Sequence, residues 1–125
     1  MSLPNVKLHY LYRDGSNYKS HATAVFVNPN QLQTKTIWRM LTTAVSDVTL
    51  LPDTPYFRPE WVGLPTVFLF EQSPYSRNAD DHFWHELSGL EETADSCAAN
   101  IYLPIEAFIH ELAQTHKNPF HSLPT

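Results

Sequence analysis

The sequence predicts an α+β fold in which the elements follow the order β-β-α-β-β-α. The first 27 residues contain two runs that alternate between two faces, on either side of an Asp-Gly pair, which is typical of a β-hairpin. Two later segments instead repeat apolar residues at helical spacing. Since strands and helices do not strictly alternate, we expect an antiparallel or mixed sheet with the helices on one of its faces.

Two period-two runs form the predicted hairpin. In "KLHYLYR", Leu8, Tyr10 and Tyr12 share one face, and the residues between them share the other. The run "SHATAVFV" alternates in the same way. Asp14 and Gly15 lie between the runs and favour a tight turn, so we expect the two strands to pair antiparallel.

Two segments carry the apolar stripe of an amphipathic helix. The first is predicted over about residues 33–46, and its stripe consists of Ile37, Leu41, Ala44 and Val48. The second is predicted over about residues 104–116, and its stripe consists of Ile105, Phe108, Ile109 and Leu112. Pro104 suits the first turn of this second helix, where the N–H that proline lacks has no helical partner.

The segments between the helices are harder to assign. Residues 50–65, "LLPDTPYFRPEWVGLP", carry four of the ten prolines, so we expect a surface segment that tucks Phe57 and Trp61 under the edge of the core. The apolar run 66–72, "TVFLFEQ", predicts the third strand. The fourth strand is expected through about Leu87, followed either by more strand or by a short helix over residues 88–99.

Composition predicts a small cytoplasmic protein. The 125 residues suit a single domain, 1–125, in which residues 117–125 form a loose tail. The net charge of −5 and the lack of a Lys/Arg run disfavour binding to nucleic acid. The apolar runs are too short to span a membrane, and no signal-peptide pattern is present. Cys97 is the single cysteine, which fits a reducing compartment, and no flanking signature of a nucleophile accompanies it.

Four segments in order resemble a family of small uncharacterised bacterial proteins: "YLYRDGSNYK", "VFVNPNQL", "WVGLP" and "DHFWHELSGLEET". That family has a Tyr-Arg-Asp-x-x-Asn-Tyr-Lys hairpin, then an Asn-Pro-x-x-Leu helix entry, a Trp-Gly-Leu/Val-Pro segment and a Trp-His-Glu segment. The resemblance covers about residues 7–93, and the valine between Trp61 and Gly63 departs from the pattern. It implies a shared fold and brings no known activity.

The hairpin island "RDGSNYK" is the first candidate site. Arg13 and Lys19 could bind the phosphates of a nucleotide or another anion while Tyr18 offers a stacking face, as in an anion-binding regulator. The alternative is a plain turn in which Asp14 and Asn17 bond the local backbone. The Asp-Gly pair and the asparagine favour the turn, and only the two flanking cations are left unexplained by it.

The segment "DDHFWHE" is the second candidate, because His82, His85 and Glu86 could hold zinc or iron in a small metal-dependent or acid–base hydrolase. His110 on the last helix could join them. On a strand, however, His82 and Glu86 share one face while His85 points to the other. The order of residues also differs from the His-Glu-x-x-His motif of metalloproteases. We therefore predict no cofactor from this segment.

Aromatic residues form the third candidate. Trp61 lies in the proline-rich segment and Trp84 in the predicted fourth strand, and tryptophan is common at interaction hot spots. The sequence contains no glycine-rich phosphate loop, no Gly-x-Ser-x-Gly and no dinucleotide fingerprint. The leading hypothesis is therefore a non-enzymatic module that binds a protein partner or a second copy of itself through a sheet edge or the aromatic loops.

Overall fold

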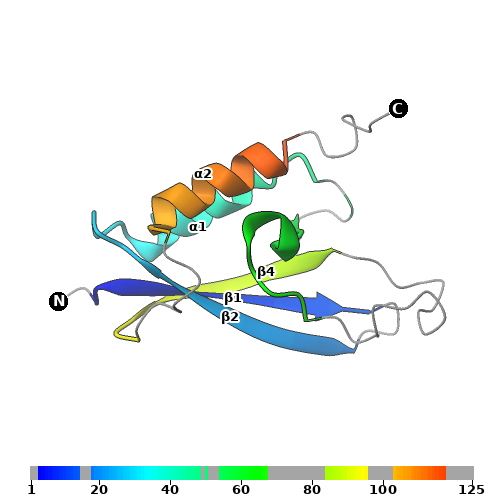
Figure 1. The fold of residues 1–125 in the computed structure, drawn as a ribbon, viewed down its shortest axis with the longest axis horizontal. Coiled ribbons are helices and arrows are strands. Elements are labelled where there is room, and N and C mark those ends of the chain that lie inside the picture. Colours follow the sequence, from blue (N-terminus) through cyan, green and yellow to red (C-terminus); the bar gives the residue numbers. More distant parts are fainter. Residues whose placement is uncertain are drawn as a thin grey trace.

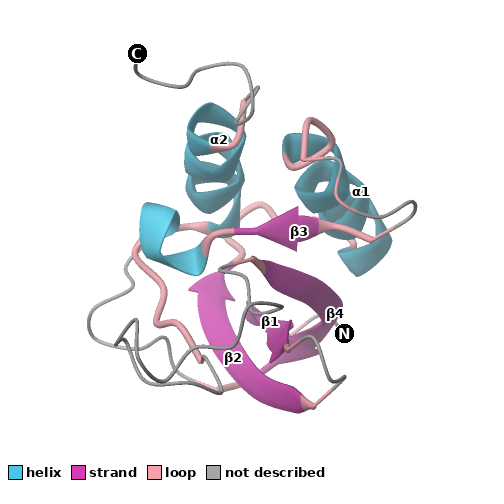
Figure 2. Ribbon diagram, turned by 90° about the vertical axis from the view of Figure 1, so that its right-hand side faces the viewer, coloured by secondary structure: helices cyan, strands magenta, loops and turns pink. Residues whose placement is uncertain are grey.

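The computed structural model describes residues 3–14, 18–48, 50, 54–67, 84–95 and 103–117. Its elements, in chain order, are β1 (Asn5–Arg13), β2 (Lys19–Val27), α1 (Thr34–Ala44), β3 (Tyr56–Phe57), the 3-10 turn η1 (Pro59–Val62), β4 (His85–Thr93) and α2 (Ile105–Thr115). The strands form one antiparallel sheet in the order β2-β1-β4-β3, and both helices lie on one face of it (Figures 1 and 2). The predicted fold class and element order are confirmed.

The opening hairpin forms as predicted. β1 and β2 pair over their full lengths, from Asn5 opposite Val27 to Arg13 opposite Lys19. At the turn, the Asp14 backbone N–H donates to the Tyr18 carbonyl at 3.0 Å. The Tyr18 backbone N–H in turn donates to the Asp14 carboxylate at 2.9 Å. This confirms the local side-chain bond expected of Asp14, whereas Gly15 to Asn17 lie outside the described residues.

The core lies between the sheet and the two helices. The inner face of β1 is fully buried at Leu8, Tyr10 and Tyr12, as the alternation predicts. Phe26 of β2 packs on Phe108 of α2, with ring centroids 4.4 Å apart. Both helices add apolar side chains to this core. They are Ile37 and Leu41 in α1, Val45 and Val48 just after it, and Ile105, Ile109 and Leu112 in α2.

The helix boundaries lie within two residues of the prediction. Pro104 directly precedes α2 as its N-cap, and the Phe108 N–H donates to the Pro104 carbonyl at 3.0 Å. Residues 118–125 of the predicted tail lie outside the described residues. Across the described ranges, neither helix is long and apolar enough to cross a membrane.

The third strand of the described sheet was not predicted: it is β3, the pair Tyr56–Phe57 within the proline-rich segment. Of the strand predicted at 66–72, Thr66 and Val67 belong to no strand, and residues 68–72 lie outside the described residues. Prolines permit a strand here because β3 is at the sheet edge and is only two residues long. The Pro55 carbonyl also accepts the Leu87 N–H at 2.9 Å. Phe57 is buried as expected, but Trp61 is 38% exposed.

The fourth strand continues past Leu87 as strand and ends at Thr93. A bulge interrupts its pairing with β1, since Tyr10 lies opposite Leu87 whereas His9 lies opposite Gly89, which leaves Ser88 as the extra residue. The backbone groups after Ser88 pair with β1, so no helix begins there for Ser88 to cap. Residues 96–99, including Cys97, lie outside the described residues.

Candidate functional site

The outer edge of β2 is the first notable surface. Among the strands that the structure describes, β2 has a single neighbour, β1 (Figure 1). Two backbone hydrogen bonds flank the ladder between β1 and β2. The Asp14 N–H donates to the Tyr18 carbonyl at one end, and the Asn28 N–H donates to the Pro4 carbonyl at the other. Hydrogen-bonded pairs alternate along an antiparallel ladder, so the even-numbered residues of β2 bond β1. The N–H and C=O groups of the odd-numbered residues therefore point away from the sheet.

In four of these residues the outward-pointing N–H and C=O groups have no hydrogen-bond partner in the part of the chain that the structure describes: Lys19, His21, Thr23 and Val25. The fifth, Val27, forms an isolated parallel bridge with Pro104. Between Lys19 and the end of β2 the sequence "SHATAVFV" contains no formally charged residue, no proline and no glycine. Natural edge strands usually carry a charge, a proline or a bulge that prevents pairing, so the described residues leave this edge open to an added strand.

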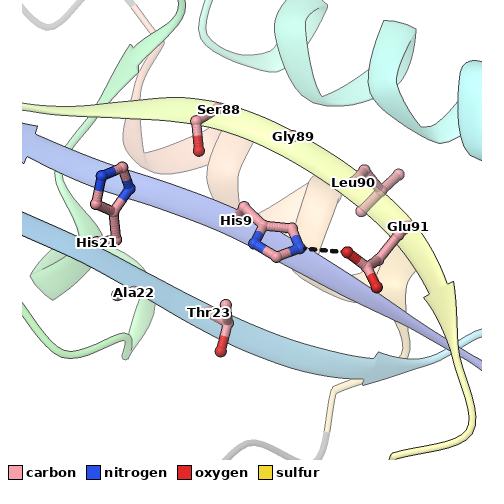
Figure 3. A pocket seen from close by; sticks show the side chains of 8 residues that line it. All are labelled: His9, His21, Ala22, Thr23, Ser88, Gly89, Leu90 and Glu91. Atoms are coloured by element: carbon pink, nitrogen blue, oxygen red, sulfur yellow. Dashed lines mark hydrogen bonds and ion pairs between the residues drawn. The ribbon is translucent and has the colours of Figure 1, made fainter.

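A groove of about 550 Å³ lies on the outer face of the sheet beside this edge (Figure 3). Its lining comes from the three longer strands: His9, His21, Ala22, Thr23, Ser88, Gly89, Leu90 and Glu91. The His21 ring extends from β2 over β1, and the Ser88 hydroxyl points toward β1 from the opposite side. The polar lining therefore consists of two imidazoles, two hydroxyls and the Glu91 carboxylate, on the face that the helices leave open.

The bulge in β4 opens this groove. Because Ser88 is inserted, both it and Gly89 lie on the outer face, and Gly89 has no side chain to fill the space beside His9. A Cβ at Gly89 would lie 3.9 Å from the His9 Cβ, an ordinary contact, and its backbone is not left-handed. The backbone conformation at this position therefore does not require glycine. The effect of having glycine here is that the groove beside His9 stays open.

Charges on the outer face are mostly paired. The His9 Nε2 lies 2.7 Å from the Glu91 carboxylate, and the Lys7 ammonium lies 2.6 Å from the Asp95 carboxylate. The bond to Lys7 is the main cause that lowers the pKa of the Asp95 carboxyl below its usual range. Lys19 and His21, in contrast, have neither a hydrogen bond nor an ion pair from their side chains within the described ranges.

The predicted hairpin site is only partly assembled. Arg13 is bound to Glu86 of β4, with its Nε 2.8 Å from one carboxylate oxygen, and this bond raises the pKa of the guanidinium. Tyr18 is 70% exposed. Lys19 extends from the start of β2 with no ion-pair partner among the described residues. The two cations therefore differ, since Arg13 is already held by an acid on the neighbouring strand.

Breaking the pair between Arg13 and Glu86 is expected to destabilise the fold. The Glu86 side chain is only 12% exposed, so Glu86→Ala should lower the free energy of unfolding by about 1–2 kcal/mol, between the values of surface and buried ion pairs. The control is Glu91→Ala: the Glu91 side chain is 57% exposed, so its pair with His9 should contribute less than about 0.5 kcal/mol. Urea unfolding of both variants measures the difference, and equal losses would contradict the importance of burial.

The predicted metal segment is divided between the two faces of the sheet. His85 is fully buried on the inner face, where its Nε2 accepts the Val67 backbone N–H at 3.1 Å. Glu86 lies on the outer face with Arg13, and His82 lies outside the described residues. His110 is exposed on α2. The described ranges hold no group of three acidic, histidine or cysteine side chains arranged to bind a metal.

The two predicted tryptophans meet in one cluster. The Trp61 and Trp84 rings are 5.6 Å apart at an angle of 77°, and the Arg58 guanidinium lies 5.0 Å and 5.4 Å from their centroids. The Arg58 backbone N–H donates to the Nε2 of His116 at 2.8 Å. These contacts tie the segment after β3 to the start of β4 and to the end of α2.

His116 is a buried neutral imidazole in this cluster. Its Nε2 accepts the Arg58 N–H, so its Nδ1 carries the proton and donates to the Leu112 carbonyl at 3.0 Å. Burial lowers its pKa to about 4, because the charged ring would lose its hydration. The sequence placed His116 at the helix end without assigning it any role.

The groove is the feature that sequence reasoning missed. The alternation in β1 places His9 on the outer face, but its neighbours there depend on pairing with both β2 and β4. The bulge at Ser88 carries no clear sequence signal, since the same residues fit a helix cap.

Comparison with known proteins adds no assignment. No family model matches the chain, and the searches of curated proteins and of solved structures find no significant match. The resemblance of the hairpin and of the Trp-His-Glu segment to small bacterial proteins remains a similarity of motifs.

Proposed function

We propose that this protein is an interaction module that binds an extended segment of a partner chain by strand addition at the outer edge of β2. The observation that carries the proposal is the row of outward-facing backbone groups at Lys19, His21, Thr23 and Val25, which have no partner among the described residues. Main-chain hydrogen bonds to such a row supply affinity in strand addition, and neighbouring side-chain sites supply specificity.

The rigidity of β2 supports this role. One edge of β2 is hydrogen-bonded to β1 along its whole length, and the Phe26 side chain packs on Phe108 of α2. The edge is thus held in the extended form before a partner arrives, which reduces the entropy cost of binding. Thr23, Val25, Phe26 and Val27 also favour sheet structure in the second half of this strand.

A second copy of the chain is one partner that this edge could accept. If two β2 strands pair antiparallel with Ala22 opposite Ala22 of the other copy, Lys19 lies opposite an uncharged valine. No like charges then face each other, and the contact is symmetric about a twofold axis. Dimerisation of this kind is strand addition with the protein itself as partner.

The hydrolase alternative receives no support from the geometry around His85 and Glu86. The Nε2 of His85 is occupied by a backbone N–H, and Glu86 is occupied by Arg13 on the opposite face. Neither group is free to transfer a proton to a substrate. We therefore advance no enzymatic function.

The experiment compares two proline variants. Proline at Thr23 removes an N–H that points outward, so the ladder with β1 should survive and strand addition should be lost. Proline at Ala22 removes an N–H that bonds β1, so this control should unfold or lose much of its stability. The probe is a short peptide of alternating threonine and valine, and its binding is followed by backbone amide NMR shifts in nitrogen-labelled protein together with native mass.

We expect the peptide to shift the amides of the odd-numbered residues of β2 in the wild type and to shift none of them in Thr23→Pro. A wild-type dimer that becomes a monomer in Thr23→Pro would support strand addition with a second copy. Binding that persists unchanged in Thr23→Pro would overturn the proposal. So would peptide-induced shifts confined to the cluster of Trp61 and Trp84.

A further inference from the structure

We infer that the added strand carries an acidic side chain, which lies over Thr23 and enters the groove between His9 and His21. This inference rests on the proposed function and names the chemistry of its partner: an extended polypeptide with an aspartate or a glutamate on the face that it shares with His21.

The rows of the sheet define the position of this side chain. His9 lies opposite Thr23 on one side and opposite Gly89 on the other, so a strand added to β2 would begin a row that continues through Thr23 and His9 to Gly89. Side chains directly opposite on neighbouring strands have Cβ atoms about 4.5–5.5 Å apart. Thr23 is small, so a longer side chain from the added strand can pass over it toward His9.

The neighbouring row brings in the second imidazole. His21 lies opposite Leu11, one row away from Thr23 on the same face, so it is a diagonal neighbour of the added residue. The groove of about 550 Å³ lies above these rows, because the bulge and Gly89 leave space beyond His9. A glutamate that crosses Thr23 would therefore have His21 beside it and the His9 ring ahead of it (Figure 3). The Nε2 of His9 is already held by Glu91, so the incoming carboxylate would meet its Nδ1, which has no partner among the described residues.

Charge complementarity favours an acidic side chain here. On the outer face of the sheet, Lys7, His9 and Arg13 are each paired with an acid on β4 or just after it. Lys19 and His21, on the edge strand itself, have no acidic partner among the described residues, and β2 contains no acid. An added strand with a carboxylate on this face would supply the missing partner, and opposite charges on neighbouring strands attract.

The direct test uses three short peptides of alternating threonine and valine that differ only in their central residue, which is glutamate, glutamine or lysine. We expect the glutamate peptide to bind about fivefold more tightly than the glutamine peptide and the lysine peptide to bind more weakly than either. Amide NMR shifts measure the dissociation constants, and the side-chain resonances of His9 and His21 report entry into the groove.

Two variants separate this inference from the proposed function. Gly89→Val fills the groove, and its Cβ makes only an ordinary contact with His9, so the fold should persist. It should abolish the preference for glutamate while the glutamine peptide still binds. The double variant His9→Gln with His21→Gln should have the same effect. Thr23→Pro, in contrast, should abolish binding of all three peptides.

Equal binding of the glutamate and glutamine peptides to the wild type would overturn the acidic partner and leave strand addition standing. A preference for glutamate that survives in the double histidine variant would also overturn it. If inorganic phosphate or acetate alone shifts His9 and His21 and Gly89→Val prevents this, while the peptides show no preference, the groove is a small-oxyanion site and the inference is wrong. A symmetric dimer through β2, which presents no acid, would likewise overturn it.

Discussion

Acidification from pH 7 to pH 4 is expected to destabilise the folded protein by about 3 kcal/mol through His116 alone. Burial lowers the pKa of this imidazole to about 4 in the folded state, from 6.5. The unfolded chain therefore binds a proton at a higher pH than the folded chain. The contribution of His116 to stability is close to its full value above about pH 7, falls mainly as the pH drops from 6.5 to 4, and levels off below pH 4, where the folded chain binds the proton too.

Structure explains why the folded state resists this proton. Protonation of His116 would place a second hydrogen at Nε2, where the Arg58 N–H already donates, and no water could solvate the charge. The positive charge of the Arg58 guanidinium also lowers the pKa, although burial contributes more. The cluster of Trp61, Trp84 and Arg58 should therefore loosen first in acid.

Urea unfolding at several pH values checks this prediction. His116→Gln removes the titrating ring but keeps a side-chain oxygen that can accept a hydrogen bond, so the slope of stability between pH 6.5 and 4 should decrease by the contribution of His116. The matched control is His110→Gln, on the exposed face of the same helix, which should leave the slope unchanged. Asp95 does not interfere, because its pKa is lowered and its contribution is lost only at more acidic pH. An unchanged slope in His116→Gln would contradict the buried neutral imidazole.

Phe108→Ala should lower the free energy of unfolding by about 3–5 kcal/mol, the cost of removing a fully buried phenylalanine and leaving a cavity. Phe108 of α2 packs on Phe26, so the cavity would lie beneath the edge strand. We therefore expect hydrogen exchange at β2 to accelerate more than exchange at β4.

The control for this prediction is Phe108→Leu, which retains most of the apolar volume and should cost less than half as much. Thermal and urea unfolding give the stabilities, and amide exchange locates the loosened region. If β2 exchanges as slowly in Phe108→Ala as in the wild type, the packing of Phe26 on α2 does not hold the edge in place.

Sequence patterns predicted the regular parts of the fold because local periodicity determines them. The alternation of Leu8, Tyr10 and Tyr12 identified the buried face of β1, and the stripes in both helices located their ends closely. β3 was missed for a physical reason. A strand of two residues is too short to show the alternation of buried and exposed residues by which longer strands are recognised.

The candidate site was harder to predict, because its residues meet only through pairing. His9, Thr23 and Gly89 share a row of the sheet although they lie on three different strands. The register of β4 depends on the bulge at Ser88, and a shift of one residue would turn every later side chain to the other face. The sequence instead indicated His85 and Glu86 as a candidate site, because both can transfer protons or bind metal. As neighbours on a strand they point to opposite faces of the sheet.

The two borders of the sheet differ, and this difference bears on assembly. A subunit with two open strand edges can polymerise without limit, since every added copy offers a fresh edge to the next. Here β3 is only two residues long and lies between Pro55 and Pro59, neither of which can donate a backbone hydrogen bond. Among the described residues, β3 pairs only with His85 and Glu86, so beyond them this border consists of β4, and a further copy would meet a stepped, proline-flanked edge in place of one straight strand. Recruitment through β2 should therefore favour a single added strand or a closed dimer over a fibre.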